Sequence, residues 1–195
     1  MGIDMSVARG VISIDPGSEN SAILTYDLMT HSVTPIGILP NMEVLDQIRF
    51  LRETRIGAED VLVVEDTKAY TLPRKSGAGR FFPEQVRVAT FWAGRFVECW
   101  CGPYVLMDRR QVKRILTGQT TVGDPEVWDA LLDRFGGSRE RAVGRKKEPG
   151  PLYGVTADLR AALAVAVAYV DEVTGTQLPS PAGGDGDFPR IPFVE

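Results

Sequence analysis

The sequence VISIDPG, residues 11–17, sets the expectations for the whole chain. The apolar run at its start predicts a buried strand. That strand ends in an acid, Asp15, and Pro16 and Gly17 then turn the chain at once. An acid at a strand end either shapes the turn or serves a site, so Asp15 is the first candidate for a functional side chain.

The same pattern recurs at residues 61–66, VLVVED, where a β-branched run again ends in acids. If 11–15 and 61–65 are parallel neighbours, Asp15 and Glu65 emerge at the same carboxyl edge, where open α/β sheets build their sites. A third acid, Asp158, stands at the start of the last predicted helix. Each acid also has a plainer interpretation as a turn residue or helix cap, but the combination predicts a shared site.

The order of predicted elements places these acids in an α/β domain. Strands are predicted over 11–15, 21–27, 32–39, 61–66 and 103–107, and helices over 42–54, 83–101, 108–118, 124–135 and 156–173. This order predicts a mixed sheet of about five strands flanked by helices, within one domain spanning 1–174. The basic segments 67–82 and 136–155 are predicted to be exposed loops, and residues 175–195 a disordered tail.

Charge is distributed unevenly along the chain. The net charge of −4 alone argues weakly against a nucleic-acid partner. However, the windows 68–87, 109–114 and 139–147 hold 14 of the 22 basic residues and only 2 of the 26 acidic ones. Basic segments around an acidic pocket suit a phosphate-containing substrate. The cations predicted to contact it are Lys68, Arg74, Lys75, Arg80, Arg110, Lys113, Arg114, Arg145, Lys146 and Lys147.

Composition disfavours several other classes of protein. His31 is the only histidine, which argues against serine hydrolases and zinc peptidases. Cys99 and Cys101 are too close for an ordinary disulfide and too few for a zinc site, so free thiols are expected. No run of about 18 uncharged apolar residues occurs. We therefore expect a cytoplasmic protein with no membrane span.

A cluster of three carboxylates has a chemical meaning of its own. Such groups repel one another and must bind protons or hold cations. Their oxygen atoms select hard ions such as Mg²⁺, for which Mn²⁺ is expected to substitute. Two ions about 4 Å apart would activate a water and stabilise the leaving 3′ oxygen in phosphodiester cleavage. The residues alone thus favour a metal-dependent enzyme acting on a phosphodiester.

Four segments, in order, resemble the RuvC family of Holliday-junction resolvases within the RNase H-like nuclease superfamily. The matching segments, between residues 11 and 172, are ISIDPG, VVEDT, RRQVKRILTGQTTVGDPEVWDALL and ADLRAALAVAVAY. The resemblance implies an RNase H-like fold, a homodimer, and Mg²⁺-dependent paired nicking of four-way DNA junctions. It implies that Asp15, Glu65 and Asp158 are the catalytic, metal-holding carboxylates. It also places the protein in the cytoplasm of a bacterium or a phage-infected cell.

The sequence departs from the family's pattern in two places. Bacterial members usually carry two acids three residues apart in the closing helix, and here Asp158 matches the first while Ala161 replaces the second. Asp66 is a candidate replacement, although neighbouring strand residues point to opposite faces. Where relatives often place a lysine near the scissile phosphate, this chain has Asp124 and Pro125. The loop at 139–150 is also longer than in bacterial members, and shortened metal sets and altered loops are features of phage or otherwise divergent relatives.

The loop after Glu65 bears on DNA recognition, because relatives insert an aromatic side chain there to unstack bases at the branch point. Tyr70 occupies the comparable place, with Phe81 and Phe82 as rivals. Two other functions stay open. One is a catalytically weak, junction-binding architectural protein on the same fold, suggested by Ala161 and the missing lysine. The other is an actin-like phosphate-binding module, although 195 residues are few for its usual two lobes.

Overall fold

The centre of the molecule is a five-stranded sheet. The computed structural model describes residues 8–54, 59–67, 72–73, 80–81 and 84–175. The strands are β1 (Ala8–Asp15), β2 (Asn20–Asp27), β3 (Val33–Pro40), β4 (Glu59–Asp66) and β7 (Tyr104–Asp108), in the order β3-β2-β1-β4-β7. The pairs β1–β2 and β2–β3 are antiparallel, whereas β1–β4 and β4–β7 are parallel. The predicted mixed α/β sheet is confirmed.

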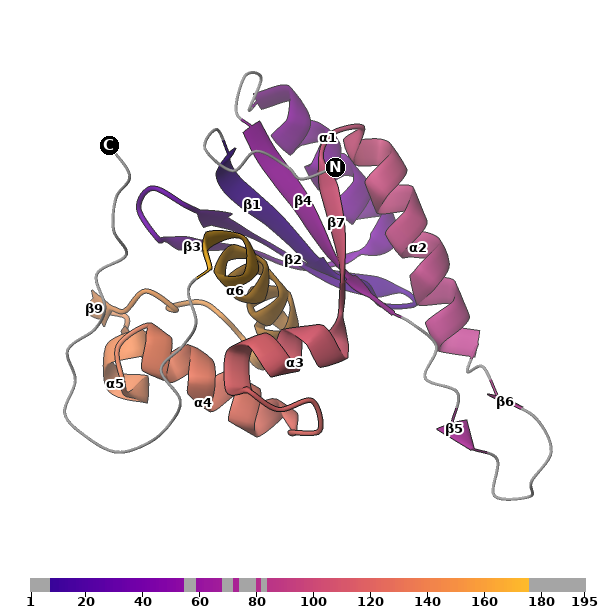
Figure 1. Cartoon of the computed structure of the whole chain (residues 1–195). Helices are drawn as coiled ribbons and strands as arrows, with labels where there is room; N and C mark the ends of the chain where they lie inside the picture. The colour runs from indigo at the N-terminus through magenta and orange to yellow at the C-terminus, as the bar shows by residue number, and fades with distance from the viewer. Residues whose placement is uncertain (1–7, 55–58, 68–71, 74–79, 82–83, 176–195) are drawn as a thin grey trace.

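Helices cover both faces of this sheet (Figure 1). On one face lie α1 (Asn41–Thr54) and α2 (Glu84–Trp100), which bury the alternate residues that include Ile14 and Val64. On the other face lies α6 (Arg160–Thr174), flanked by α3 (Arg109–Thr117) and α4 (Asp124–Arg134). Because α6 is rich in alanine, its backbone approaches the sheet closely, and the Ser13 hydroxyl donates to the Ala162 carbonyl at 2.7 Å.

The segment 136–155 is more regular than the predicted loop. It contains α5 (Arg139–Ala142) and an antiparallel hairpin of β8 (Gly144–Arg145) and β9 (Glu148–Pro149). The base of the hairpin packs against α5 backbone to backbone, because a Cβ atom at Gly150 would lie 2.3 Å from the Arg141 carbonyl oxygen. Local propensity did not reveal this packing, since it depends on Gly150 meeting the end of α5 and on Gly144 meeting the backbone of residues 148–150.

The remaining elements are short. β5 (Leu72–Pro73) and β6 (Arg80–Phe81) pair with each other within the predicted loop 67–82, and η1 (Ala157–Leu159) is a single 3₁₀ turn before α6. The helix α6 ends at Thr174, and the predicted tail lies outside the described residues except for Gly175. Within the described parts of the chain, every helix is too short or too polar to span a bilayer.

Candidate functional site

Two carboxylates meet at the carboxyl edge of the sheet. The parallel register joins Ile14 to Val64, so the residues that follow them, Asp15 and Glu65, come next to one another on neighbouring strands. Side chains alternate between the two faces of a strand, and Ser13, two residues before Asp15, bonds to α6. Asp15 and Glu65 therefore emerge together on the side of the sheet that α6 covers, as the sequence predicted.

A buried polar network holds the turn that follows Asp15. The Gly17 amide donates to the Ser21 hydroxyl (3.1 Å), which donates to Asn41 Oδ1 (2.6 Å), and Asn41 Nδ2 donates back to the Gly17 carbonyl (3.1 Å). A Cβ atom at Gly17 would lie 2.0 Å from the Asn20 carbonyl oxygen, so only glycine fits. The network fixes the chain direction immediately after the carboxylate and limits how far Asp15 can move.

Both carboxyl groups are costly to ionise in this structure. Burial, and then the neighbouring charge of Glu65, raise the pKa of Asp15 from 3.8 to about 7. Burial also raises the pKa of Glu65, although the Arg109 guanidinium opposes that change. A carboxyl group with a raised pKa is one that a nearby cation would stabilise in its charged form. The pair thus has the electrostatics of a cation-binding site.

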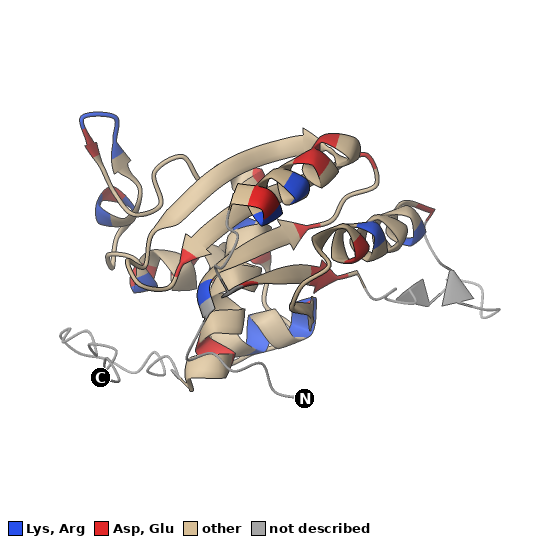
Figure 2. Cartoon of the chain, turned by 90° about the horizontal axis from the view of Figure 1, so that it is seen from above, with Lys and Arg blue, Asp and Glu red and all other residues tan. Residues whose placement is uncertain are grey.

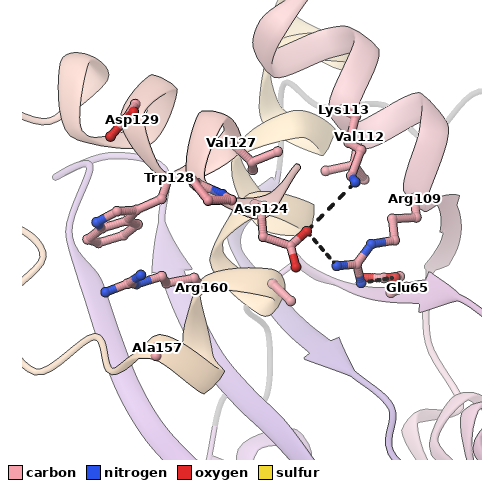
Figure 3. Close-up of a pocket in the computed structure, with 13 residues that line it drawn as sticks. Glu65, Arg109, Val112, Lys113, Asp124, Val127, Trp128, Asp129, Ala157 and Arg160 are labelled. Atoms are coloured by element: carbon pink, nitrogen blue, oxygen red, sulfur yellow. Dashed lines mark hydrogen bonds and ion pairs between the residues drawn. The ribbon is translucent and has the colours of Figure 1, made fainter. Parts of the chain in front are cut away.

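One arginine already reaches this pair. The helix α3 begins directly after β7, where the Asp108 side chain caps it by accepting from the Arg110 amide (2.7 Å). Arg109, the first helical residue, therefore emerges at the same sheet edge as Glu65. Its Nη1 donates to Glu65 Oε1 at 3.2 Å, and its Nη2 donates to Asp124 Oδ1 at 2.8 Å (Figure 3). A single guanidinium is thus shared by two acids.

A cavity of about 390 Å³ opens beside Glu65, with walls from α3, α4 and the first turns of α6. On one side Lys113 lies 3.7 Å from Asp124 Oδ1 and donates to the Val122 carbonyl at 2.6 Å. On the other side Arg160 stacks on the Trp128 ring, 4.2 Å from its centroid. The walls are therefore mixed: they are apolar in part and carry three cations together with the carboxylates of Glu65, Asp124 and Asp129.

The structure does not complete the predicted set of three acids. Asp158 is exposed in η1 and is not among the residues that line the cavity. Asp66 still belongs to β4, in register with Asp108, so it falls on the face opposite Glu65. In the described part of the chain, no three His, Cys, Asp or Glu side chains come close enough to hold a metal ion. Asp158 stays a prediction as a ligand.

Two carboxylates nevertheless fit a magnesium ion. Mg²⁺ keeps several of its waters and is usually bound by one or two carboxylates together with substrate phosphates, rather than by a complete protein cage. Asp15 and Glu65 supply hard oxygen ligands, and their raised pKa values show that a cation would be favourable there. Asp15 and Glu65 are thus the described residues that would hold the ion, and Mg²⁺ itself stays a prediction from the sequence.

The predicted DNA-contacting residues lie in three places. Arg110 and Arg114 are exposed on α3, whereas Lys113 points into the cavity. The hairpin β8–β9 exposes Arg145, Lys146 and Lys147 at its tip (Figure 2) and lies at the opposite end of the molecule from β5 and β6. The predicted contacts that lie outside the described residues are Lys68, Tyr70, Arg74 and Lys75, with Phe82 as well; for Arg80 and Phe81 only the strand position is described.

Several site residues were not predicted from the sequence. Arg109 had a usable signal, since it follows a strand end just as Asp15 does. Asn41 and Trp128 had none, because their roles depend on contacts across the fold. Asp124 stood out only as a departure from a family pattern, and its ion pair with Arg109 follows from the packing of α4 beside α3.

Fold and site together define an α/β protein with paired carboxylates at the carboxyl edge of a mixed sheet. No family model matches the sequence, and no curated protein matches it significantly. Two solved structures of RuvC from Thermus thermophilus are similar in architecture. The RuvC in complex with a Holliday junction substrate is 18% identical, with a TM-score of 0.48 over 85% of this chain and 94% of that one. A second RuvC structure is 20% identical, with a TM-score of 0.49 over 86% of this chain and 97% of that one. With identities of 18% and 20% and TM-scores of 0.48 and 0.49, these likenesses assign no activity to this chain.

Proposed function

We propose that the protein is a metal-dependent endonuclease that cuts branched DNA, with four-way junctions as its substrate. One observation carries the proposal: the half-buried Asp15 and the buried Glu65 are brought together, with raised pKa values, at the carboxyl edge of two parallel strands. Paired acids at that edge suit metal-assisted phosphodiester hydrolysis. The ordered motifs that resemble the RuvC family give the substrate class.

Asp15 and Glu65 would hold Mg²⁺, or Mn²⁺ in its place, with Asp158 as the predicted third ligand. When bound, such an ion activates water and stabilises the charge that develops on the leaving oxygen. Arg109 helps to keep Glu65 ionised by lying 3.2 Å from Oε1. The network of Gly17, Ser21 and Asn41 keeps Asp15 in place.

The cations around the cavity would bind the DNA backbone. Arg109 and Lys113 lie at the edge of the cavity nearest Glu65, and their positive charge opposes the repulsion between the acids and a phosphate. Arg110 and Arg114 extend this charge along the exposed side of α3. Backbone contacts of this kind give affinity without sequence selection.

Paired nicks at a junction require two active sites, so a homodimer is part of the proposal. A surface on α2 and β7 supports it: Phe91 is 63% exposed, Tyr104 49% and Leu106 47%. Exposed apolar residues of this size commonly mark protein interfaces. A second copy of the chain would cover them.

The proposal is tested by incubating the protein with a fluorescently labelled four-way junction and Mg²⁺ or Mn²⁺. We expect cleavage by the wild type and a loss of at least about 100-fold in Asp15→Asn, since even outer-shell partners of a metal cost up to about that much. The matched control is Asp46→Asn, an exposed acid on α1 paired with Arg49, which should cut normally. Asp158→Asn reports whether the predicted third ligand takes part. Absence of cleavage by the wild type, or full cleavage by Asp15→Asn, would overturn the assignment.

A second candidate is a junction-binding architectural protein with little catalysis. It is favoured by the absence of any three-ligand cluster among the described residues and by the alanine at position 161. This function predicts tight binding to the junction that changes neither with Mg²⁺ nor in Asp15→Asn. Measuring binding and cleavage on the same junction separates the two functions.

A further inference from the structure

The three cations that line the cavity differ in what they already bind. Arg109 is engaged by Glu65 and Asp124, and Lys113 by the Val122 carbonyl and, at 3.7 Å, by Asp124. Arg160 has no such partner: within the described residues, no carboxylate pairs with it and its Nε atom is buried without a hydrogen bond. Among the described residues that line this cavity, Arg160 is therefore the cation whose charge no carboxylate neutralises.

The position of Arg160 is nevertheless fixed. Its guanidinium lies over the Trp128 ring at 4.2 Å from the centroid, and Trp128 itself is only 7% exposed. Stacking on an indole ring holds a guanidinium by one face and leaves the N–H groups at its edge free to donate. Figure 3 shows this stacked pair across the cavity from Arg109 and Glu65. The guanidinium is thus held in place to donate hydrogen bonds, whereas a flexible surface arginine would first have to be ordered.

The surroundings favour an anion at this point. No carboxylate among the described residues neutralises the Arg160 guanidinium, and a hydrogen bond between a charged donor and a charged acceptor is about twice as strong as a neutral one. The side chains of Ala157, Ala161 and Ala164 are small, leave room beside the guanidinium and bring no negative charge. A phosphate group suits the fork of an arginine, because its oxygens accept two parallel N–H bonds.

We propose that Arg160, held on Trp128, binds a backbone phosphate of the nucleic-acid strand whose neighbouring phosphodiester lies at Asp15 and Glu65. This inference rests on the proposed function for the identity of the ligand, because it takes the anion in the cavity to be DNA. It adds a positioning residue that no sequence pattern indicated. Arg160 sets the register of the strand relative to the carboxylates and takes no part in the bond-breaking step.

The test measures binding of a labelled four-way junction by the full-length protein, in EDTA, over a series of salt concentrations. We expect Arg160→Gln to weaken binding about tenfold or more, as loss of a hydrogen bond to a charged group does. The slope of log K against log salt should fall by about 0.9, the value for one duplex phosphate contact. Arg160→Lys should keep the slope and lose part of the affinity, because it keeps the charge without the fork. Arg49→Gln on α1, across the sheet from the cavity, is the matched control and should change neither quantity.

Thermal melting separates this role from simple packing on Trp128. A binding role predicts that Arg160→Gln melts within a few degrees of the wild type, because it removes a buried donor that has no partner. A merely structural role predicts a lower melting temperature with an unchanged salt slope, and that result would overturn the inference.

The outcomes for the two proposals are distinguishable. Cleavage by the wild type together with an unchanged salt slope in Arg160→Gln would leave the proposed function standing and overturn the phosphate contact. Binding without cleavage would overturn the nuclease, while the change in slope would still support the contact. A wild type that binds no DNA in this assay would overturn both.

Discussion

Two buried acids in this protein, Asp171 and Glu65, are paired with arginine in different ways. Asp171 on α6 is 3% exposed and has Arg134 of α4 to itself, with Nη1 donating to Oδ2 at 2.8 Å. At the sheet edge, Arg109 serves both Glu65 and Asp124. Asp15 has neither an ion pair nor a hydrogen bond among the described side chains, although burial raises its pKa to about 7. A balanced pair ties two helices together, whereas a surplus of acid leaves negative charge that a bound cation would compensate.

The largest expected effect follows from breaking the balanced pair. Arg134→Met would leave Asp171 buried without its cation and should lower the free energy of unfolding by about 3–5 kcal/mol. The loss should be greater at pH 8 than at pH 5. Burial already raises the pKa of Asp171 to about 6. In acid the buried carboxyl is therefore protonated and needs no cation, whereas above the raised pKa it is charged and the missing arginine is felt in full.

Urea denaturation at the two pH values measures this difference. The control is Arg49→Met, which breaks an exposed pair with Asp46 and should change the free energy of unfolding by no more than about 0.5 kcal/mol. Equal losses for the two variants would contradict the structural role of Asp171 and Arg134.

The surplus acid predicts stabilisation by metal. At a Mg²⁺ concentration about 100 times its dissociation constant, the wild type should gain about 2.7 kcal/mol in the free energy of unfolding. The same addition should leave Asp15→Asn almost unchanged, because one of the two ligands is lost. Thermal melting with and without Mg²⁺ measures both proteins, and an equal response would place the ion elsewhere.

The network behind the site should matter next. Asn41→Ala removes the acceptor for the Ser21 hydroxyl and the donor for the Gly17 carbonyl. Leaving buried polar groups without partners costs about 1–3 kcal/mol. We also expect reduced junction cleavage, since the turn after Asp15 is no longer held. Asn20→Ala, an exposed neighbour, should change neither quantity appreciably, and cleavage at the wild-type rate by Asn41→Ala would show that the network serves stability alone.

The smallest expected effect is a gain in stability, not a loss. Without metal, Asp15→Asn should raise the free energy of unfolding by about 1 kcal/mol, a usual gain when a functional site gives up its strain. The gain should be larger at pH 8 than at pH 5, because the unfolded chain ionises Asp15 above pH 3.8 whereas the folded protein keeps the proton up to about pH 7, so the cost of Asp15 grows between those two values. Denaturation at the two pH values measures it, and a loss of stability at pH 8 would mean that Asp15 is a structural acid like Asp171.

The strands and the acid pair could be predicted because their signals are local. A β-branched run ending in an acid appears twice, and parallel neighbours necessarily bring Asp15 and Glu65 to one edge. The alanine-rich pattern of residues 156–173 likewise indicated a helix that packs closely on the sheet, and α6 spans Arg160–Thr174.

Other parts of the site depend on distant contacts. Asn41 supports the turn at Gly17 only because α1 begins beside it, and Arg160 meets Trp128 only because α4 crosses the start of α6. No single stretch of sequence contains either relation. The hairpin at 144–149 was missed for a similar reason, since Gly150 packs against the backbone of α5 and Gly144 against the backbone of residues 148–150.

The shared guanidinium of Arg109 also has a consequence for how the sequence can vary among related chains. Because one cation compensates Glu65 and Asp124 together, a change at position 124 alters the charge felt at position 65, although the two lie 59 residues apart in the sequence. Substitutions at positions 65, 109 and 124 will therefore not have independent effects. In related chains we expect these three positions to vary as a set, so that an alignment would record the contact as covariation.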